Sequence, residues 1–128
     1  MKKQRTLNGR TGRNRVRPTI ITMVFAAVTA GILWLTLAPF SSGPAIGPHG
    51  DKWGHLLMFM GWSLLFGFWM LQRNPRQPAW GIWVKVPLVG TLFGVLIEIL
   101  QMSLPFDRHG DVYDAMANLA GSLLAAAL

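Results

Sequence analysis

Apolar residues gather in four long stretches, at residues 19–38, 53–71, 78–101 and 112–128, with short polar segments between them. A helix needs about 20 mostly apolar residues to cross a bilayer. The first three stretches reach that length, and the fourth, at 1.5 Å per residue, spans only about 25 Å. Lipid offers no hydrogen bonds, so each stretch must satisfy its own backbone as a helix. The pattern predicts an all-α fold, an integral membrane bundle of four transmembrane helices.

Proline and glycine mark the connections. Several prolines and glycines lie in the first connection, Pro75 lies in the second, and Pro105 and Gly110 lie in the third. Residues 1–18 form a basic leader that we expect to be disordered, and residues 19–128 form one membrane domain. The first stretch resembles a secretory signal, but it exceeds the usual signal core of about 7–15 residues, which favours an anchor. Small residues at Gly90 and Gly94, and at Ala117 and Gly121, favour close helix packing.

Composition supports a membrane location. The chain is 52% hydrophobic and 13% charged, whereas soluble domains carry about 25% charged residues. The absence of cysteine excludes disulfides and thiolate metal sites. The net charge of +7 is concentrated, since seven of the twelve basic residues precede residue 18. A basic tail of this kind favours orientation in the membrane, or contact with anionic lipid, over nucleic-acid binding, which we reject.

The basic residues also predict which side faces the cytoplasm. In a four-span arrangement ten of them lie on one side, in the leader, at Arg73, Arg76 and Lys85, and two lie on the other, at Lys52 and Arg108. Lysine and arginine concentrate in cytoplasmic segments. We therefore expect a multi-pass protein of the inner membrane with both termini in the cytoplasm, and with the first and third connections outside.

Polar residues cluster near the outward ends of the last three stretches. Residues three, four or seven apart share a helix face, as Asp51 and His55 do, and as Glu98 and Gln101 do. Three packed helices would bring these faces into one outward pocket. Its expected members are Asp51, Lys52, His55, Glu98, Gln101, Arg108, Asp111, Asp114 and Asn118.

Each of these residues also has a plainer interpretation. Asp111 and Asp114 can cap the fourth helix and favour its dipole. His55 can face water at the membrane surface, and Gln101 and Asn118 can form hydrogen bonds between helices. Glu98 within a membrane helix is costly unless it is paired, and Arg108, His55 or Asn118 are its expected partners. The grouping of all these residues on one side favours the pocket.

The motifs Asp51-Lys52-x-x-His55 and Glu98-x-x-Gln101, the latter followed by Pro105, Arg108, Asp111, Asp114, Asn118 and Gly121, resemble those of the VanZ-like family. The resemblance covers residue 35 to residue 128 and leaves the leader outside it. The family takes its name from a protein that raises bacterial resistance to the glycopeptide teicoplanin. The resemblance therefore implies a role in the cell envelope, without implying that this chain itself confers resistance.

Three functions remain open. The pocket can bind the polar head of an envelope lipid, a cell-wall precursor or a lipoglycopeptide, with Arg108 on an anionic group. Acids beside His55 can instead serve a membrane hydrolase or transferase, with or without a divalent cation. Glu98 can also carry protons or cations in a transporter. The sequence assigns no cofactor and no metal ligands, and membrane lipid is the one partner that it predicts directly.

Overall fold

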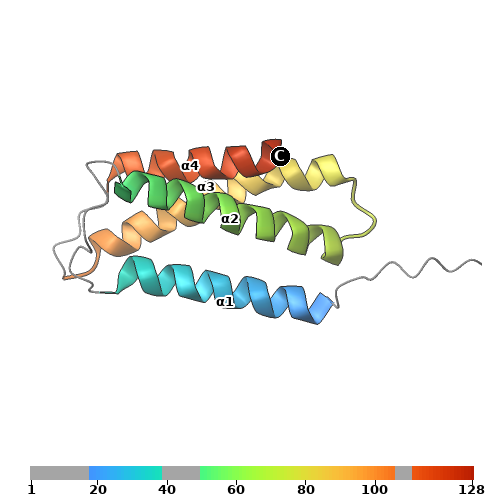
Figure 1. The fold of residues 1–128 in the computed structure, drawn as a ribbon, viewed down its shortest axis with the longest axis horizontal. Helices are drawn as coiled ribbons and strands as arrows, with labels where there is room; N and C mark the ends of the chain where they lie inside the picture. The colour runs from blue at the N-terminus through green and yellow to red at the C-terminus, as the bar shows by residue number, and fades with distance from the viewer. Residues whose placement is uncertain (1–17, 39–49, 106–110) are drawn as a thin grey trace, which may run out of the picture.

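The computed structural model describes residues 18–38, 50–105 and 111–128. Most of the leader, and Arg108, lie outside these ranges. The described chain forms four helices, α1 (Pro18–Leu37), α2 (Gly50–Arg73), α3 (Ala79–Met102) and α4 (Val112–Ala127), drawn in Figure 1. Every helix end lies within three residues of the end predicted from the apolar pattern. The all-α prediction is confirmed for the described residues.

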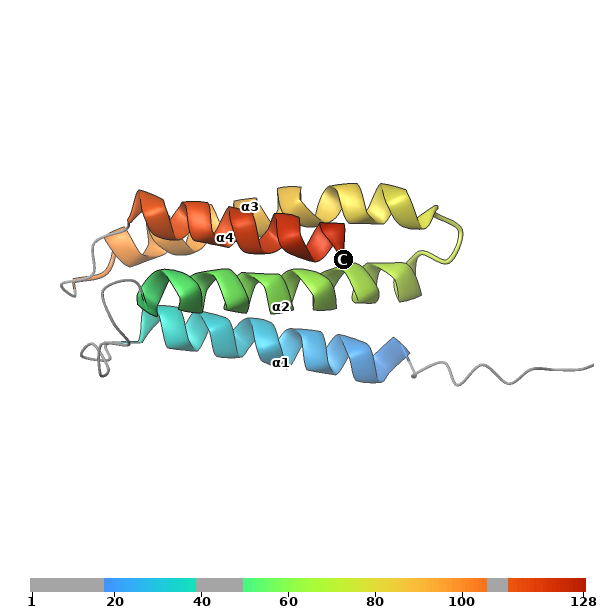
Figure 2. The same cartoon turned by 45° about the horizontal axis from the view of Figure 1, so that its top comes forward.

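The helices run in alternating directions as one bundle. α2 and α3 contact each other, and each of them also contacts α1 and α4. The most extensive packing is between α2 and α4. Figures 1 and 2 show α1 and α4 on opposite sides of the bundle. Because the helices alternate in direction, α2 and α4 begin at the end of the bundle where α3 ends. We call this end the polar end. The opposite end carries Arg73, Arg76 and Lys85 and is called the basic end.

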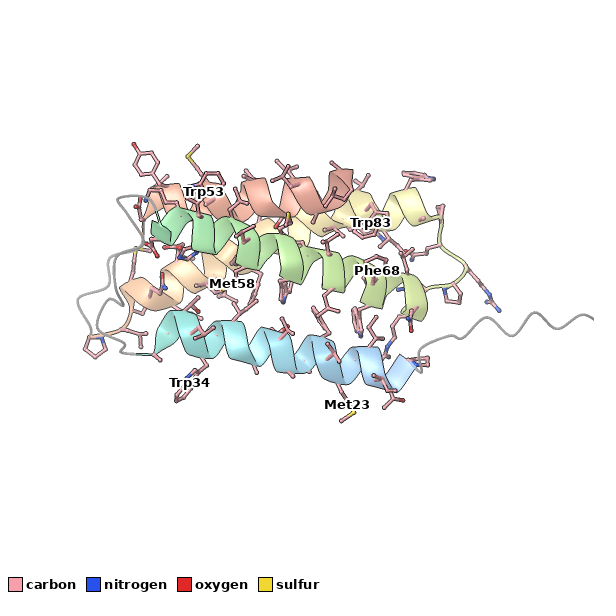
Figure 3. All side chains as sticks on the ribbon, in the orientation of Figure 1. Met23, Trp34, Trp53, Met58, Phe68 and Trp83 are labelled. Atoms are coloured by element: carbon pink, nitrogen blue, oxygen red, sulfur yellow. The ribbon has the colours of Figure 1, made fainter. Side chains whose placement is uncertain are left out.

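Three of the four helices, α1, α2 and α3, are long and apolar enough to cross a membrane. α4, with 16 residues, is shorter than such a span. Large apolar side chains cover the outside of the bundle, as Met23 and Trp34 do where they point away from it in Figure 3. Exposing so much apolar surface to water would be costly. The fold is therefore that of a membrane protein.

An aromatic core joins α1, α2 and α3. Its central residue is Trp62 of α2, whose ring centroid lies 4.6 Å from that of Phe93 and 5.5 Å from that of Phe25. The indole nitrogen of Trp62 donates a hydrogen bond of 2.9 Å to Thr29 Oγ1 on α1. This bond satisfies a polar group that neither lipid nor water can reach.

Small residues let α4 approach the other helices closely, as the sequence predicts. A Cβ atom at Gly121 would meet the backbone oxygen of Leu56 on α2. A Cβ atom at Gly94 on α3 would lie 3.0 Å from the Cβ atom of Asn118. The close contact sets the first two turns of α4 directly beside the first two turns of α2. The polar side chains of both helices then meet at the polar end.

Candidate functional site

The N-terminus of α4 is fixed by Asp111. Its backbone is extended, with φ −110° and ψ 124°, and its Oδ1 atom accepts the N–H of Tyr113 at 2.8 Å. The other oxygen, Oδ2, lies 3.0 Å from Lys52 Nζ on α2. The N–H of Tyr113, and then the ammonium of Lys52, lower the pKa of Asp111 below its ordinary value. The capping role expected for Asp111 is confirmed, and the same carboxylate also ties α4 to α2.

Asp114, one turn further along α4, faces α2 instead of its own helix end. Its Oδ1 atom lies 3.5 Å from Lys52 Nζ, and its Oδ2 atom lies 3.8 Å from Nε2 of His55. Its side chain is only 11% exposed. Lys52 therefore lies between two carboxylates of α4, at 3.0 and 3.5 Å.

His55 lies beneath Lys52, and its side chain is 12% exposed. Its Nδ1 atom is 3.1 Å from Oδ1 of Asn118, a residue of α4 that is completely buried. Its Nε2 atom is 3.9 Å from Oδ1 of Asp51, one turn earlier on α2, whose side chain is 78% exposed. His55 thus faces the interface between α2 and α4, and the alternative of a histidine directed at water does not describe its position.

Glu98 brings α3 into the same region. Its Oε2 atom accepts the backbone N–H of Asp111 at 3.1 Å, and the residue is 7% exposed. The sequence pattern predicts Arg108, His55 or Asn118 as its partner. Among the described residues the hydrogen bond to Glu98 instead comes from the backbone at the start of α4, and Arg108 lies outside those residues.

Gln101 is directed elsewhere. Its Nε2 atom donates a hydrogen bond of 2.9 Å to the backbone oxygen of Thr36, which joins α3 to α1. This contact corresponds to the plainer interpretation of Gln101, a hydrogen bond between helices. Tyr113 also lies beside Lys52, with its ring centroid 5.5 Å from Lys52 Nζ. It was not among the candidate residues named from the sequence. Its position two residues after the cap residue Asp111 was the available signal.

Seven of the nine candidate residues therefore meet at the polar end, and we call them the polar cluster. They are Asp51, Lys52, His55, Glu98, Asp111, Asp114 and Asn118. With neutral His55, four carboxylates and one ammonium give the cluster a formal charge of −3. Its rim, at Asp51, Lys52 and Asp111, is open to solvent, and its floor is buried.

The floor of the polar cluster contains polar atoms that its own residues do not satisfy. Within the described chain, Glu98 Oε1, Asp114 Oδ1 and Asn118 Nδ2 are buried without a hydrogen bond. Asp114 Oδ1 does lie within ion-pair distance of Lys52 Nζ, at 3.5 Å. Buried polar atoms in native proteins nearly always have partners, so each exception calls for a physical explanation.

Together the apolar bundle and the polar cluster define a class, that of helical membrane proteins with a cluster of charged side chains at one end of the bundle. The chain belongs to the VanZ/LLP1 family, whose family model matches residues 4–128. The resemblance inferred from the motifs is thereby confirmed. The match also includes most of the basic leader, so the expectation that the leader lies outside the family is wrong. Comparison with curated proteins and with solved structures finds no match.

Proposed function

We propose that this chain is a VanZ-type protein of the bacterial inner membrane that binds the head group of an amphiphilic envelope molecule in its polar cluster. The ligand class that fits best carries sugar or peptide groups on a lipid tail, as a lipid-linked cell-wall precursor or a lipoglycopeptide does. The tail would lie against the apolar outer surface of the bundle. Of the three functions left open by the sequence, binding is the one that we favour.

The proposal places the polar end outside the cell. The basic end carries Arg73, Arg76 and Lys85, and the leader adds seven basic residues, which favours the cytoplasm for that end and for both termini. We treat α4 as a fourth span. Its exposed residues are apolar, as Met116, Leu119, Leu123 and Leu124 are. Its length of about 24 Å is short of a hydrocarbon core of about 30 Å, a mismatch that local thinning of the bilayer accommodates.

The observation that carries the proposal is that buried polar atoms at the floor of the cluster lack hydrogen bonds, whereas the side chains at its rim are exposed to solvent. A cluster that served only to join helices would pair its own buried atoms. Here Glu98, Asp114 and Asn118 each keep a buried atom without a hydrogen bond among the described residues. The carboxylate of Asp51, at the rim of the same cluster, is exposed to solvent. The cluster therefore has binding capacity beyond what the fold requires.

The charge of the polar cluster selects the kind of head group. Four carboxylates offer hydrogen-bond acceptors, whereas Lys52 is the one cationic side chain among the described members. A complementary ligand brings donors, such as the hydroxyl, amide and amine groups of sugars and peptides. Arg108 is the expected contact for any anionic group of the same ligand. A simple anionic lipid matches the acidic cluster poorly.

Binding is best tested on the full chain in nanodiscs. Lipid II, teicoplanin and phosphatidylglycerol are titrated separately, and binding is followed by native mass spectrometry and by tryptophan fluorescence. We expect lipid II or teicoplanin to bind and phosphatidylglycerol to bind weakly. Lys52→Gln and Asp114→Asn should weaken binding roughly tenfold or more, as loss of a charged hydrogen bond does. Lys85→Gln, at the basic end, is the matched control for lost charge.

Two outcomes would overturn the binding proposal. One is equal affinity in Lys52→Gln, Asp114→Asn and Lys85→Gln, since the polar cluster would then take no part. The other is preferential binding of phosphatidylglycerol, since a plain anionic lipid does not complement four carboxylates. Size-exclusion chromatography and circular dichroism of each variant establish that the bundle has folded.

One observation favours a second function, that of a membrane-embedded hydrolase or transferase. His55 lies between Asp51 and Asp114, at 3.9 and 3.8 Å, beneath the open rim. An imidazole beside carboxylates is a suitable general base or acid. Incubation of lipid II with the purified protein, followed by mass spectrometry, tests this alternative. A product that His55→Asn fails to form would favour the enzyme over the binding protein.

A further inference from the structure

We propose that Asp51, His55 and Asp114 form a binding site for a divalent transition-metal ion, of the Zn²⁺ or Mn²⁺ type. The site lies between α2 and α4 at the polar end. One imidazole nitrogen and two carboxylate oxygens, one from each of these three side chains, lie within 4.8 Å of one another. The inference concerns the cation alone and does not depend on the head group proposed above.

The hydrogen bond between His55 and Asn118 fixes the chemistry of the imidazole. Asn118 Oδ1 can only accept, so Nδ1 of His55 carries the hydrogen and donates it across 3.1 Å. In the neutral ring the lone pair then belongs to Nε2, the atom that faces Asp51 and Asp114. Histidine ligands of metals characteristically donate their second N–H to a carbonyl or carboxylate in this way. The buried amide of Asn118 is such a partner.

Three electron-pair donors therefore face one another. Nε2 of His55 is 3.9 Å from Oδ1 of Asp51 and 3.8 Å from Oδ2 of Asp114. These distances are too long for hydrogen bonds. Ligand atoms about 2.1 Å from a metal ion lie roughly 3 to 3.5 Å apart, so a modest inward movement closes the site. The exposed side chain of Asp51 is free to make that movement.

Buried oxygen atoms supply a second, independent argument. Glu98 is 7% exposed, and its Oε1 atom is buried without a hydrogen bond among the described residues. Asp114 is 8% exposed, and its Oδ2 atom, which faces His55, lies 3.8 Å from Nε2. Burying this much negative charge is costly unless a cation compensates it. Lys52 contributes one positive charge, and a divalent ion would lower the remaining negative charge of the polar cluster further.

The donor set and its exposure indicate the kind of site. One imidazole and two carboxylates suit Zn²⁺ or Mn²⁺ better than soft ions, which prefer thiolates. Three protein ligands beneath a solvent-open rim leave at least one position for water or a ligand, as in open zinc sites. A metal ion in that position would polarise a carbonyl or phosphate oxygen of a bound head group.

Metal binding is tested on the purified full chain in nanodiscs. The protein is stripped with a chelator and titrated with ZnCl₂ and with MnCl₂ by calorimetry, and with CoCl₂ by visible absorption. We expect one ion per chain, and a Co²⁺ absorption band that reports the imidazole ligand. Asp51→Asn and His55→Asn should each weaken the affinity roughly tenfold or more. Asp51 is exposed, so its substitution leaves the fold intact.

The matched control is Asp111→Asn, which removes a carboxylate of the same cluster that is not a ligand. Asparagine caps helices as well as aspartate does, so α4 keeps its N-terminus. This variant should retain the ion and the Co²⁺ band. Equal loss in Asp111→Asn and Asp51→Asn would overturn the proposal, because it would indicate general attraction to acidic groups. Absence of binding to the wild-type chain would also overturn it.

The two proposals fail separately. Metal titrations contain no head-group ligand, so their outcome is independent of lipid II or teicoplanin. Head-group titrations are repeated with and without chelator. If the head group still binds in the presence of chelator, the head-group proposal stands even when the metal site fails. If the metal ion binds and no head group does, the metal site stands and the head-group proposal fails.

Discussion

Close packing of α4 on α2 gives the most direct prediction, at Gly121. A Cβ atom there would meet the backbone oxygen of Leu56 and would lie 2.9 Å from the backbone nitrogen of Met60. Ordinary van der Waals contact begins at 3.4 Å. Backbone atoms cannot rotate away as side chains do, so Gly121→Ala must push the two helices apart.

Gly61→Ala is the matched control, since a Cβ atom at Gly61 on α2 meets nothing within 4 Å. Both substitutions gain helix propensity, up to about 1 kcal/mol. Only Gly121→Ala adds overpacking, which costs about 1–3 kcal/mol. We therefore expect the free energy of unfolding of Gly121→Ala to lie roughly 1–3 kcal/mol below that of Gly61→Ala.

The assay is SDS-induced unfolding of the purified chain in mixed micelles, followed by tryptophan fluorescence and circular dichroism. Gly121→Ala should also weaken lipid II binding, because it separates Lys52 from Asp111 and Asp114. Equal unfolding midpoints for Gly121→Ala and Gly61→Ala would refute the close packing of α4 on α2. The described position of the polar cluster would then be refuted with it.

Three further predictions concern single contacts. Trp62→Phe removes the donor to Thr29 and should destabilise the bundle by roughly 0.6–1.7 kcal/mol; a double-mutant cycle with Thr29→Val should show this coupling, and strictly additive effects would contradict it. The lowered pKa of Asp111 stabilises the folded state above the unfolded pKa of about 3.9, and this stabilisation is lost as pH falls through the folded value. The stability difference between wild type and Asp111→Asn should therefore shrink in an acid series of SDS titrations, and a constant difference would argue against it. Gln101→Leu should weaken packing of α1, seen as faster amide exchange in that helix, without changing lipid II affinity.

The lengths of the helices were predictable because lipid penalises polar groups sharply. An apolar stretch must end where the chain reaches water, so composition alone located each end within three residues. The meeting of Asp51, Glu98 and Asp114 at one end was predictable for a similar reason. Alternating spans return polar ends to the same membrane surface, whatever the rotation of each helix.

The sequence could not predict how each helix is rotated about its own axis. Glu98 and Gln101 are three residues apart and were expected on one face. At 3.6 residues per turn they are separated by about 60° around the helix axis. Because α3 lies between α1 and α4, that angle is enough to direct Glu98 to the start of α4 and Gln101 to Thr36 on α1. Only the packing of all four helices decides between such neighbours.

The depth of the polar cluster explains why its charges need compensation. Asn118 lies seven residues beyond Asp111, about 10 Å deeper along α4, and Asp114 lies between them. A charged side chain buried within a membrane helix is costly unless it is paired. Lys52 can reach Asp111 and Asp114 from the rim, at 3.0 and 3.5 Å, whereas His55 faces the oxygen of Asp114 that Lys52 does not contact. The two oxygens of Asp114 are thus divided between the ammonium of Lys52 and a position beside Nε2 of His55. At this second position an added cation would reduce the negative charge of the polar cluster.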